Sequence, residues 1–234
     1  MKIRKLHSWN VTPAEARAIQ ENLRAQVELL DRLPRLRRVA GCDVAFDLPR
    51  DRAFAGVIVY SFPEMRELER VWAAAPLEFP YVPGLLSFRE APALLAAFAK
   101  LRHAPQLIFC DAQGYAHPRR FGLACHLGVL LDCPTIGCAK SRLIGTHDEP
   151  GASAGSWAEL RDAHEVIGAV LRTRAGVKPI FISQGHRVSL ERAIQLTLAV
   201  CDGFRIPRPT READHFVEQV KREHLRSRIV QRAR

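Results

Sequence analysis

Two short stretches of this chain each carry an aspartate directly after a cysteine inside an apolar run. They read GCDVAF around Asp43 and IFCDAQ around Asp111. A carboxylate in such a setting is costly to desolvate unless a cation meets it. Because successive side chains of a strand alternate between faces, each cysteine is expected on one face and its aspartate on the other. The shared pattern predicts that the two segments are neighbouring strands with their acids side by side.

Two acids so placed repel each other. Neighbouring strands lie about 4.8 Å apart, and two ionised carboxylates about 5 Å apart repel by roughly 3 kcal/mol at an effective dielectric constant of 20. Protons or a divalent cation would relieve this repulsion. Since no histidine or cysteine cluster accompanies the acids, a hard ion such as Mg²⁺ or Mn²⁺ is favoured over zinc. The alternative, ordinary acids paired with arginine or lysine at strand ends, stays open at this point.

The rest of the pattern predicts one α/β domain over residues 1–234, with a mixed sheet flanked by helices. Thr12, Pro13 and Glu15 form a capping box that opens a helix over about 12–33. Three consecutive strands are expected next, the first two as an antiparallel pair. Alternating strands and helices then indicate parallel pairing. The expected strands are 38–47, 53–63, 67–77, 106–111, 133–140 and 176–186, and the later helices are 91–101, 122–132 and 189–203.

Three further expectations come from local composition. Pro92 is placed in the first turn of its helix, where a proline is tolerated. Residues 146–157, rich in glycine, serine and proline, are expected to form a long exposed loop. The tail over about 217–234 is basic and is expected to be helical and then frayed, either solvated or touching phosphate.

The charge balance points to a polyanionic partner. Lysine and arginine number 35 against 25 aspartates and glutamates, which gives a formal net charge of +10. Nucleic acid is the leading candidate, and a solvated basic surface without a specific partner is the alternative. The six scattered cysteines form no CxxC pair and are expected to be reduced and buried. With no apolar leader and no stretch long enough to span a bilayer, we expect a cytoplasmic protein without membrane contact.

Five motifs in order resemble those of the endonuclease V family, which nicks nucleic acid near deaminated bases. The likeness runs from about Arg38 to Asp214, and the motifs are GCDVAF, FPYVPGLLSFRE, CDAQGYAHPRRFGLACHLG, CAKSRLIG and SQGHRVSLERA. The resemblance implies a ribonuclease H-like fold, which agrees with the mixed sheet of three antiparallel strands followed by parallel strands. It also implies a metal-dependent endonuclease of DNA repair that acts on inosine-containing DNA, and we expect a monomer.

The resemblance implies a set of catalytic acids. Asp43, Glu90 and Asp111 would hold Mg²⁺, with Mn²⁺ as a substitute. Glu90 is expected near a helix start, where the dipole favours a negative charge. Without the resemblance, it would be interpreted as an ordinary first-turn acid. A fourth ligand corresponds to Asp214, which suits Mg²⁺, although some relatives carry a histidine there and His215 follows directly. Adjacent helical residues point about 100° apart, so both are not expected to bind the same ion.

The remaining motifs imply the reaction and the recognition of the base. Lys140 would stabilise phosphate charge or orient water. The cut would fall at the second phosphodiester bond 3′ of the damaged base, leaving a 3′-hydroxyl and a 5′-phosphate. Tyr81, stiffened by two flanking prolines, would enter the helix while the base turns out into a pocket. Residues matching the pocket segments are Gly84, Leu85, Gly114 and His117. Arg119 and Arg120 could touch phosphate, although an exposed arginine pair usually has no partner.

The sequence leaves two competing functions open. Another ribonuclease H-like nuclease, such as a junction resolvase, would cut by structure without a preference for inosine. A non-catalytic nucleic-acid binder would need only the basic charge. The preference for DNA or RNA, the range of lesions and the number of metal ions are not fixed by the sequence.

Overall fold

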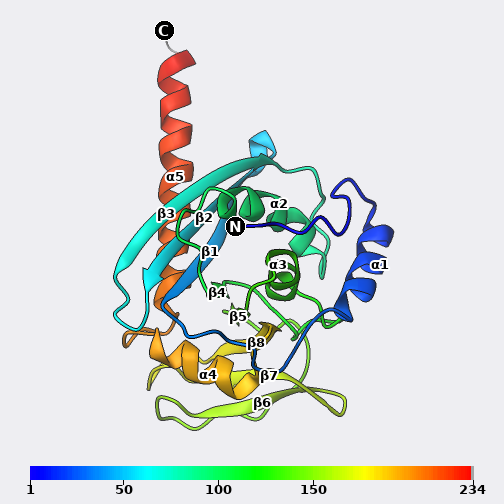
Figure 1. The fold of residues 1–234 in the computed structure, drawn as a ribbon, viewed down its shortest axis with the longest axis vertical. Coiled ribbons are helices and arrows are strands. Elements are labelled where there is room, and N and C mark those ends of the chain that lie inside the picture. Colours follow the sequence, from blue (N-terminus) through cyan, green and yellow to red (C-terminus); the bar gives the residue numbers. More distant parts are fainter. Residues whose placement is uncertain (233–234) are drawn as a thin grey trace.

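A mixed sheet with helices on both faces forms the body of the protein, as the computed structural model of residues 1–232 shows (Figure 1). The strand order is β3-β2-β1-β4-β5-β8-β7-β6. The strands are β1 Arg38–Asp47, β2 Arg52–Ser61, β3 Glu67–Pro76, β4 Leu107–Cys110, β5 Thr135–Ala139, β6 Trp157–Asp162, β7 Glu165–Leu171 and β8 Ile180–His186. The helices are α1 Pro13–Arg24, α2 Leu86–Phe98, α3 Leu123–Leu131, α4 Leu190–Ala199 and α5 Arg208–Arg232, with a 3₁₀ turn η1 at Leu48–Arg50.

The sheet confirms the predicted class and corrects one half of its topology. Strands β3, β2 and β1 are antiparallel, and β4 joins β1 and β5 in parallel, as expected. Strand β8 is instead antiparallel to β5. The reason is the hairpin β6–β7, which the sequence analysis missed and which makes the chain enter β8 from the opposite end of the sheet. The alternation of exposed and inward residues in WAELRD was the available signal for β6.

The first helix is shorter than expected. The capping box of Thr12 and Glu15 is present, but α1 ends at Arg24 rather than near residue 33. The following segment is not helical, and its polar groups bind the turn after β8. Glu28 accepts a hydrogen bond from the backbone of Arg187 through its carbonyl (2.6 Å), and the Asp31 side chain accepts one from the backbone of Ser189 (2.7 Å). A helix over these residues would lose such contacts.

The second helix begins earlier than expected. Its first residue is Leu86, so Pro92 lies inside the helix and Glu90 is its fifth residue rather than a first-turn acid. The helix extends upstream because Phe88 is buried against Phe79 in a small apolar cluster. The dipole argument for Glu90 is weakened accordingly, because the dipole acts mainly within the first turn.

The two faces of the sheet are covered by different helices. Cys42 packs with residues of α2 and α3 on one face, while α5 crosses the other face of β1 and β2 and extends past the sheet (Figure 1). The predicted basic tail is therefore the later part of a helix that starts at Arg208, and residues 233–234, where fraying was predicted, lie outside the described residues. All six cysteines are free and buried, as expected. In the part of the chain that the structure describes, no helix is both long and apolar enough to cross a bilayer.

Close packing of α5 on β1 depends on a glycine. A Cβ built on Gly41 would lie 2.0 Å from the carbonyl oxygen of Pro209, in the first turn of α5. No side chain fits in this gap, so the absence of one at Gly41 lets the helix backbone approach the strand directly. This approach brings the start of α5, and with it Asp214, to the sheet.

We expect Gly41→Ala to destabilise the fold by about 2–3 kcal/mol, because the added methyl group forces α5 away from β1. Chemical denaturation monitored by circular dichroism measures the loss. Gly151→Ala is the matched control, since its Cβ meets only the side chain of Ser156, at 3.0 Å. Equal stability of the two variants would contradict the proposed role of Gly41.

Candidate functional site

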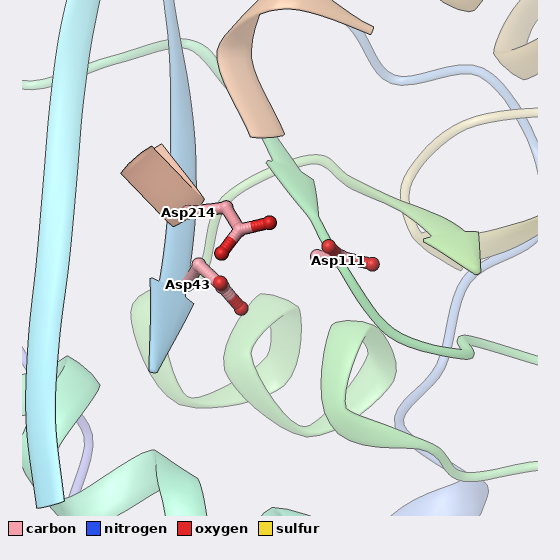
Figure 2. Close-up of side chains that lie close together, drawn as sticks. All are labelled: Asp43, Asp111 and Asp214. Carbon is pink, nitrogen blue, oxygen red and sulfur yellow. The ribbon is translucent and has the colours of Figure 1, made fainter. Parts of the chain in front are cut away.

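Three aspartates from distant parts of the chain meet beside the end of β4. Asp43 comes from β1, Asp111 directly follows β4, and Asp214 comes from α5 (Figure 2). Cys42 pairs with Cys110 across the parallel strands, which sets Asp43 and Asp111 at the same level, as predicted. One carboxylate oxygen of each aspartate lies within 4.8 Å of the others.

Burial and the nearby acids disfavour the charged forms of Asp43 and Asp111. The pKa of Asp43 is raised to about 8, first because the side chain is desolvated and second because Asp111 is nearby, with Asp214 adding to the effect. Burial also raises the pKa of Asp111, although a hydrogen bond from Lys140 opposes that rise.

Lys140 lies between two of the aspartates. Its Nζ atom is 2.6 Å from Oδ2 of Asp111 and 3.2 Å from Oδ2 of Asp214. Burial alone would lower the pKa of Lys140, but the hydrogen bonds with these acids raise it. Lys140 therefore stays charged and partly neutralises the cluster.

Glu90 approaches the aspartates from α2, which packs on the other face of the sheet. Its pKa is raised well above the usual range, by burial first and then by Asp43 and Asp111. Among the described residues, however, Glu90 is not a member of the group whose oxygens lie within 4.8 Å of one another. The structure thus brings Glu90 near the cluster without placing it inside.

The donor set fits a hard divalent cation. Three carboxylates converge while the lysine between them supplies one positive charge, so residual negative charge faces a common centre. Oxygen donors of this kind hold Mg²⁺, Mn²⁺ or Ca²⁺ rather than a soft metal. Asp214 belongs to the cluster, whereas His215 is exposed and does not, which settles the geometric choice between these neighbours.

A cavity of about 370 Å³ adjoins the acids. Asp111 and Lys140 belong to both the cavity wall and the acidic cluster, so the two features are contiguous. Tyr81 lines the cavity with 72% of its surface exposed. Gly84 and His117 line it as well, as the sequence motifs implied. The volume is in the range of small-ligand pockets, in which one base can be accommodated.

Two of the expected pocket residues lie elsewhere. The side chain of Leu85 is fully buried in the small cluster with Phe79 and Phe88, and its neighbour Leu86 lines the cavity instead. Gly114 does not line the cavity; a Cβ there would lie 2.2 Å from the carbonyl oxygen of Gln184, so this glycine permits close packing against β8.

The arginine pair is occupied by contacts within the protein. Arg120 forms ion pairs with Asp162 (2.9 Å) and Glu165 (2.7 Å). Arg119 donates hydrogen bonds to the side chain of Gln20 and to the carbonyl of Gly84. The expectation that both arginines touch phosphate therefore has no support here. Neither Gln20 nor the hairpin acids were singled out from the sequence, which gives no signal for contacts this far apart along the chain.

His117 is neutral near pH 7. Burial, together with the nearby charge of Arg119, lowers its pKa to about 4. Its Nδ1 accepts a hydrogen bond from the backbone of Arg119 (3.2 Å), so Nε2 carries the proton and donates it to the carbonyl of Gly84 at 2.9 Å.

Comparison with known proteins gives consistent matches over most of the chain. The family model described as Endonuclease V matches residues 21–215. An Endonuclease V of Roseiflexus castenholzii is 52% identical over 213 residues, covering 91% of this chain and 95% of the relative.

Solved structures agree in fold. The crystal structure of the Endonuclease V from Streptomyces avermitilis superposes with a TM-score of 0.89 at 44% identity, covering 96% of this chain and 100% of that one. Endonuclease V from Ciona intestinalis, solved in complex with DNA containing an inosine followed by a ribo-adenosine, has a TM-score of 0.78 at 31% identity and covers 90% of this chain and 98% of its own.

The raised pKa of Asp43 predicts a pH-dependent stability for the metal-free protein. Between the ordinary value of 3.8 and about 8, the folded state keeps a proton that the unfolded chain releases. The folded state then binds more protons, so stability should fall as pH rises through this window. Asp43→Asn should flatten the decline, measured as the denaturation midpoint at successive pH values in chelator. The control is Asp148→Asn, at an exposed loop acid, and a decline of wild-type size in the Asp43 variant would contradict the assignment.

Proposed function

The chain belongs to the endonuclease V family and is an endonuclease, and from this premise we propose that it nicks DNA containing a deaminated base, chiefly inosine. The cut falls at the second phosphodiester bond 3′ of that base and leaves a 3′-hydroxyl and a 5′-phosphate. The observation that supports this most directly is the shared wall of the acidic cluster and the cavity, formed by Asp111 and Lys140. A base held in the cavity leaves its own backbone beside the acids.

The metal in this proposal is Mg²⁺, for which Mn²⁺ can substitute. Asp43, Asp111 and Asp214 would hold it, with Glu90 as a further ligand from the opposite face. When bound, the ion supplies a water of lowered pKa and neutralises charge on the phosphate. Asp43, whose pKa is raised to about 8 without the ion, would lose its proton when the ion binds.

Lys140 keeps a positive charge at the boundary between cluster and cavity. Its side chain is about half exposed, and its ammonium group is held in place by two carboxylates. A phosphate that enters beside the acids would meet this charge, which stabilises the negative charge that develops as the P–O bond breaks.

Base recognition is assigned to the cavity. Tyr81 is an exposed ring at its rim, suited to fill the space that an extruded base leaves in the duplex. Extrusion costs a few kcal/mol, and less where pairing is already poor, so mispaired inosine is easier to expose than paired guanine. Hypoxanthine lacks the 2-amino group of guanine, and a close-fitting wall can exclude that group or leave it unpaired.

Three broader features complete the proposal. The chain acts as one nuclease domain, since the cluster takes its aspartates from β1, from the residue after β4 and from α5. We also propose that it works as a monomer. The nick starts repair of the deaminated strand.

The decisive experiment is cleavage of an inosine-containing duplex in Mg²⁺ at low salt. We expect a nick at the second bond 3′ of inosine. Asp111→Asn should reduce the rate by about 10³-fold or more while duplex binding is retained, because the variant loses a charged ligand but keeps its shape. Denaturing gels measure cleavage and anisotropy measures binding, with Asp148→Asn as the control at an exposed acid.

Other outcomes would identify other functions. Cutting of branched DNA without a preference for inosine would indicate a resolvase-like nuclease, and binding without cleavage by the wild type would indicate a non-catalytic binder. Matched inosine DNA and RNA in competition determine which nucleic acid is preferred.

Metal binding should separate the two neighbouring candidates on α5. Asp214→Asn should weaken Mn²⁺ binding by about tenfold or more, because one carboxylate of the cluster is lost. His215→Asn should leave the affinity unchanged, because His215 is exposed and outside the cluster. Isothermal titration calorimetry gives both values, and a larger loss in the His215 variant would contradict the assignment.

A further inference from the structure

The loop that carries Tyr81 is held to the cavity wall through one carbonyl oxygen. The carbonyl of Gly84 receives hydrogen bonds from Nε2 of Gln20 (3.1 Å), Nε2 of His117 (2.9 Å) and a terminal nitrogen of Arg119 (2.7 Å). Gly84 has φ of +76°, a conformation that favours glycine. Three donors from two separate segments thus converge on the turn three residues after the rim tyrosine.

Gln20 is the member of this set that connects both sides of the cavity. It lies on α1, is 1% exposed, and precedes the residues matched by the family model. Besides Gly84, its amide nitrogen binds the carbonyl of Phe121 (3.1 Å), and its amide oxygen accepts from Nε of Arg119 at 2.6 Å. These contacts fix the orientation of the amide, because the nitrogen faces two carbonyls and the oxygen faces a guanidinium group.

We propose that Gln20 is a positioning residue for base recognition, which fixes the loop of Tyr81 and Gly84 relative to the segment of His117 to Phe121. This inference rests on the proposed function for its substrate and adds a determinant on α1. A buried amide with its hydrogen bonds satisfied adds rigidity, whereas an apolar side chain of similar size would leave the carbonyls of Gly84 and Phe121 with one donor fewer. The loop would then sample positions in which the cavity wall is open.

The substitution that isolates this role is Gln20→Met, which keeps the volume and removes the hydrogen bonds. For cleavage of inosine duplex in Mg²⁺, we expect KM to rise about tenfold and kcat to change less than about twofold, since binding of the base is affected while the acids are not. The control is Gln195→Met at an exposed site on α4. An unchanged KM, or a fall in kcat alone, would overturn the proposal.

A double-mutant cycle tests whether Gln20 acts through the shared carbonyl. Arg119→Met removes another donor to Gly84. If both residues hold the same loop, the double variant should raise KM by less than the product of the two single effects. Strict multiplication would show that they act independently and would overturn the shared tether.

A readout without activity keeps this inference separate from the proposed function. Hydrogen exchange measured by mass spectrometry should show faster exchange, by about tenfold, in the peptide covering residues 80–86 of Gln20→Met, while β2 is unchanged. Equal exchange in wild type and variant would overturn the tether even if inosine is cleaved. A wild type that fails to cleave would refute the proposed function and leave the exchange result to decide the tether. If Gln20→Met does not fold, Gln20→Glu, which keeps an acceptor for Arg119, takes its place in each assay.

Discussion

Repulsion among carboxylates that are forced together is the interaction around which the rest of this structure is arranged. Asp43, Asp111 and Asp214 share a space, and burial and proximity oppose the ionisation of Asp43 and Asp111. Asp43, whose pKa is raised to about 8, keeps its proton near pH 7, and Lys140 lies between the other two. Because this arrangement lowers the stability of the fold, rigid elements are needed to hold the three aspartates together.

Those elements are the parallel pair β1–β4 and the helix α5. The pair sets Asp43 beside Asp111 because Cys42 is in register with Cys110, and the two thiols fill the apolar face below. The helix brings the third acid from the opposite end of the chain, and it can do so because Gly41 presents no side chain to its first turn. Register and close packing thus create the electrostatic cost that a bound divalent ion would remove.

The cavity depends on a different kind of constraint. Most of its wall comes from loops, and the buried backbone polar groups of a loop need hydrogen-bond partners. Here the carbonyl of Gly84 accepts three hydrogen bonds, and the side chain of Arg120 forms two ion pairs. Arg119 and Arg120 therefore support the wall, and Lys140 places a positive charge at the edge of the acidic cluster.

Local pattern was enough to predict much of this arrangement. The capping box of α1, the three antiparallel strands and the neighbouring positions of Asp43 and Asp111 follow from alternation and spacing, which are properties of short segments. The strand β6 of the hairpin β6–β7 shows the same alternation, although it was not among the predicted strands. The early end of α1 and the inner positions of Leu85 and Gly114 had no such signal, because they result from contacts with residues far along the chain.

The sequence by itself therefore determined which acids could share a site, since strand alternation and a common motif place two of them on one face. The tertiary structure decided that His215 stays outside the cluster that Asp214 joins, that Glu90 lies at its edge and that Gln20 supports the cavity. The physical reason is that a side chain's partner depends on distances between elements, and those distances are set by packing of the whole sheet and its helices.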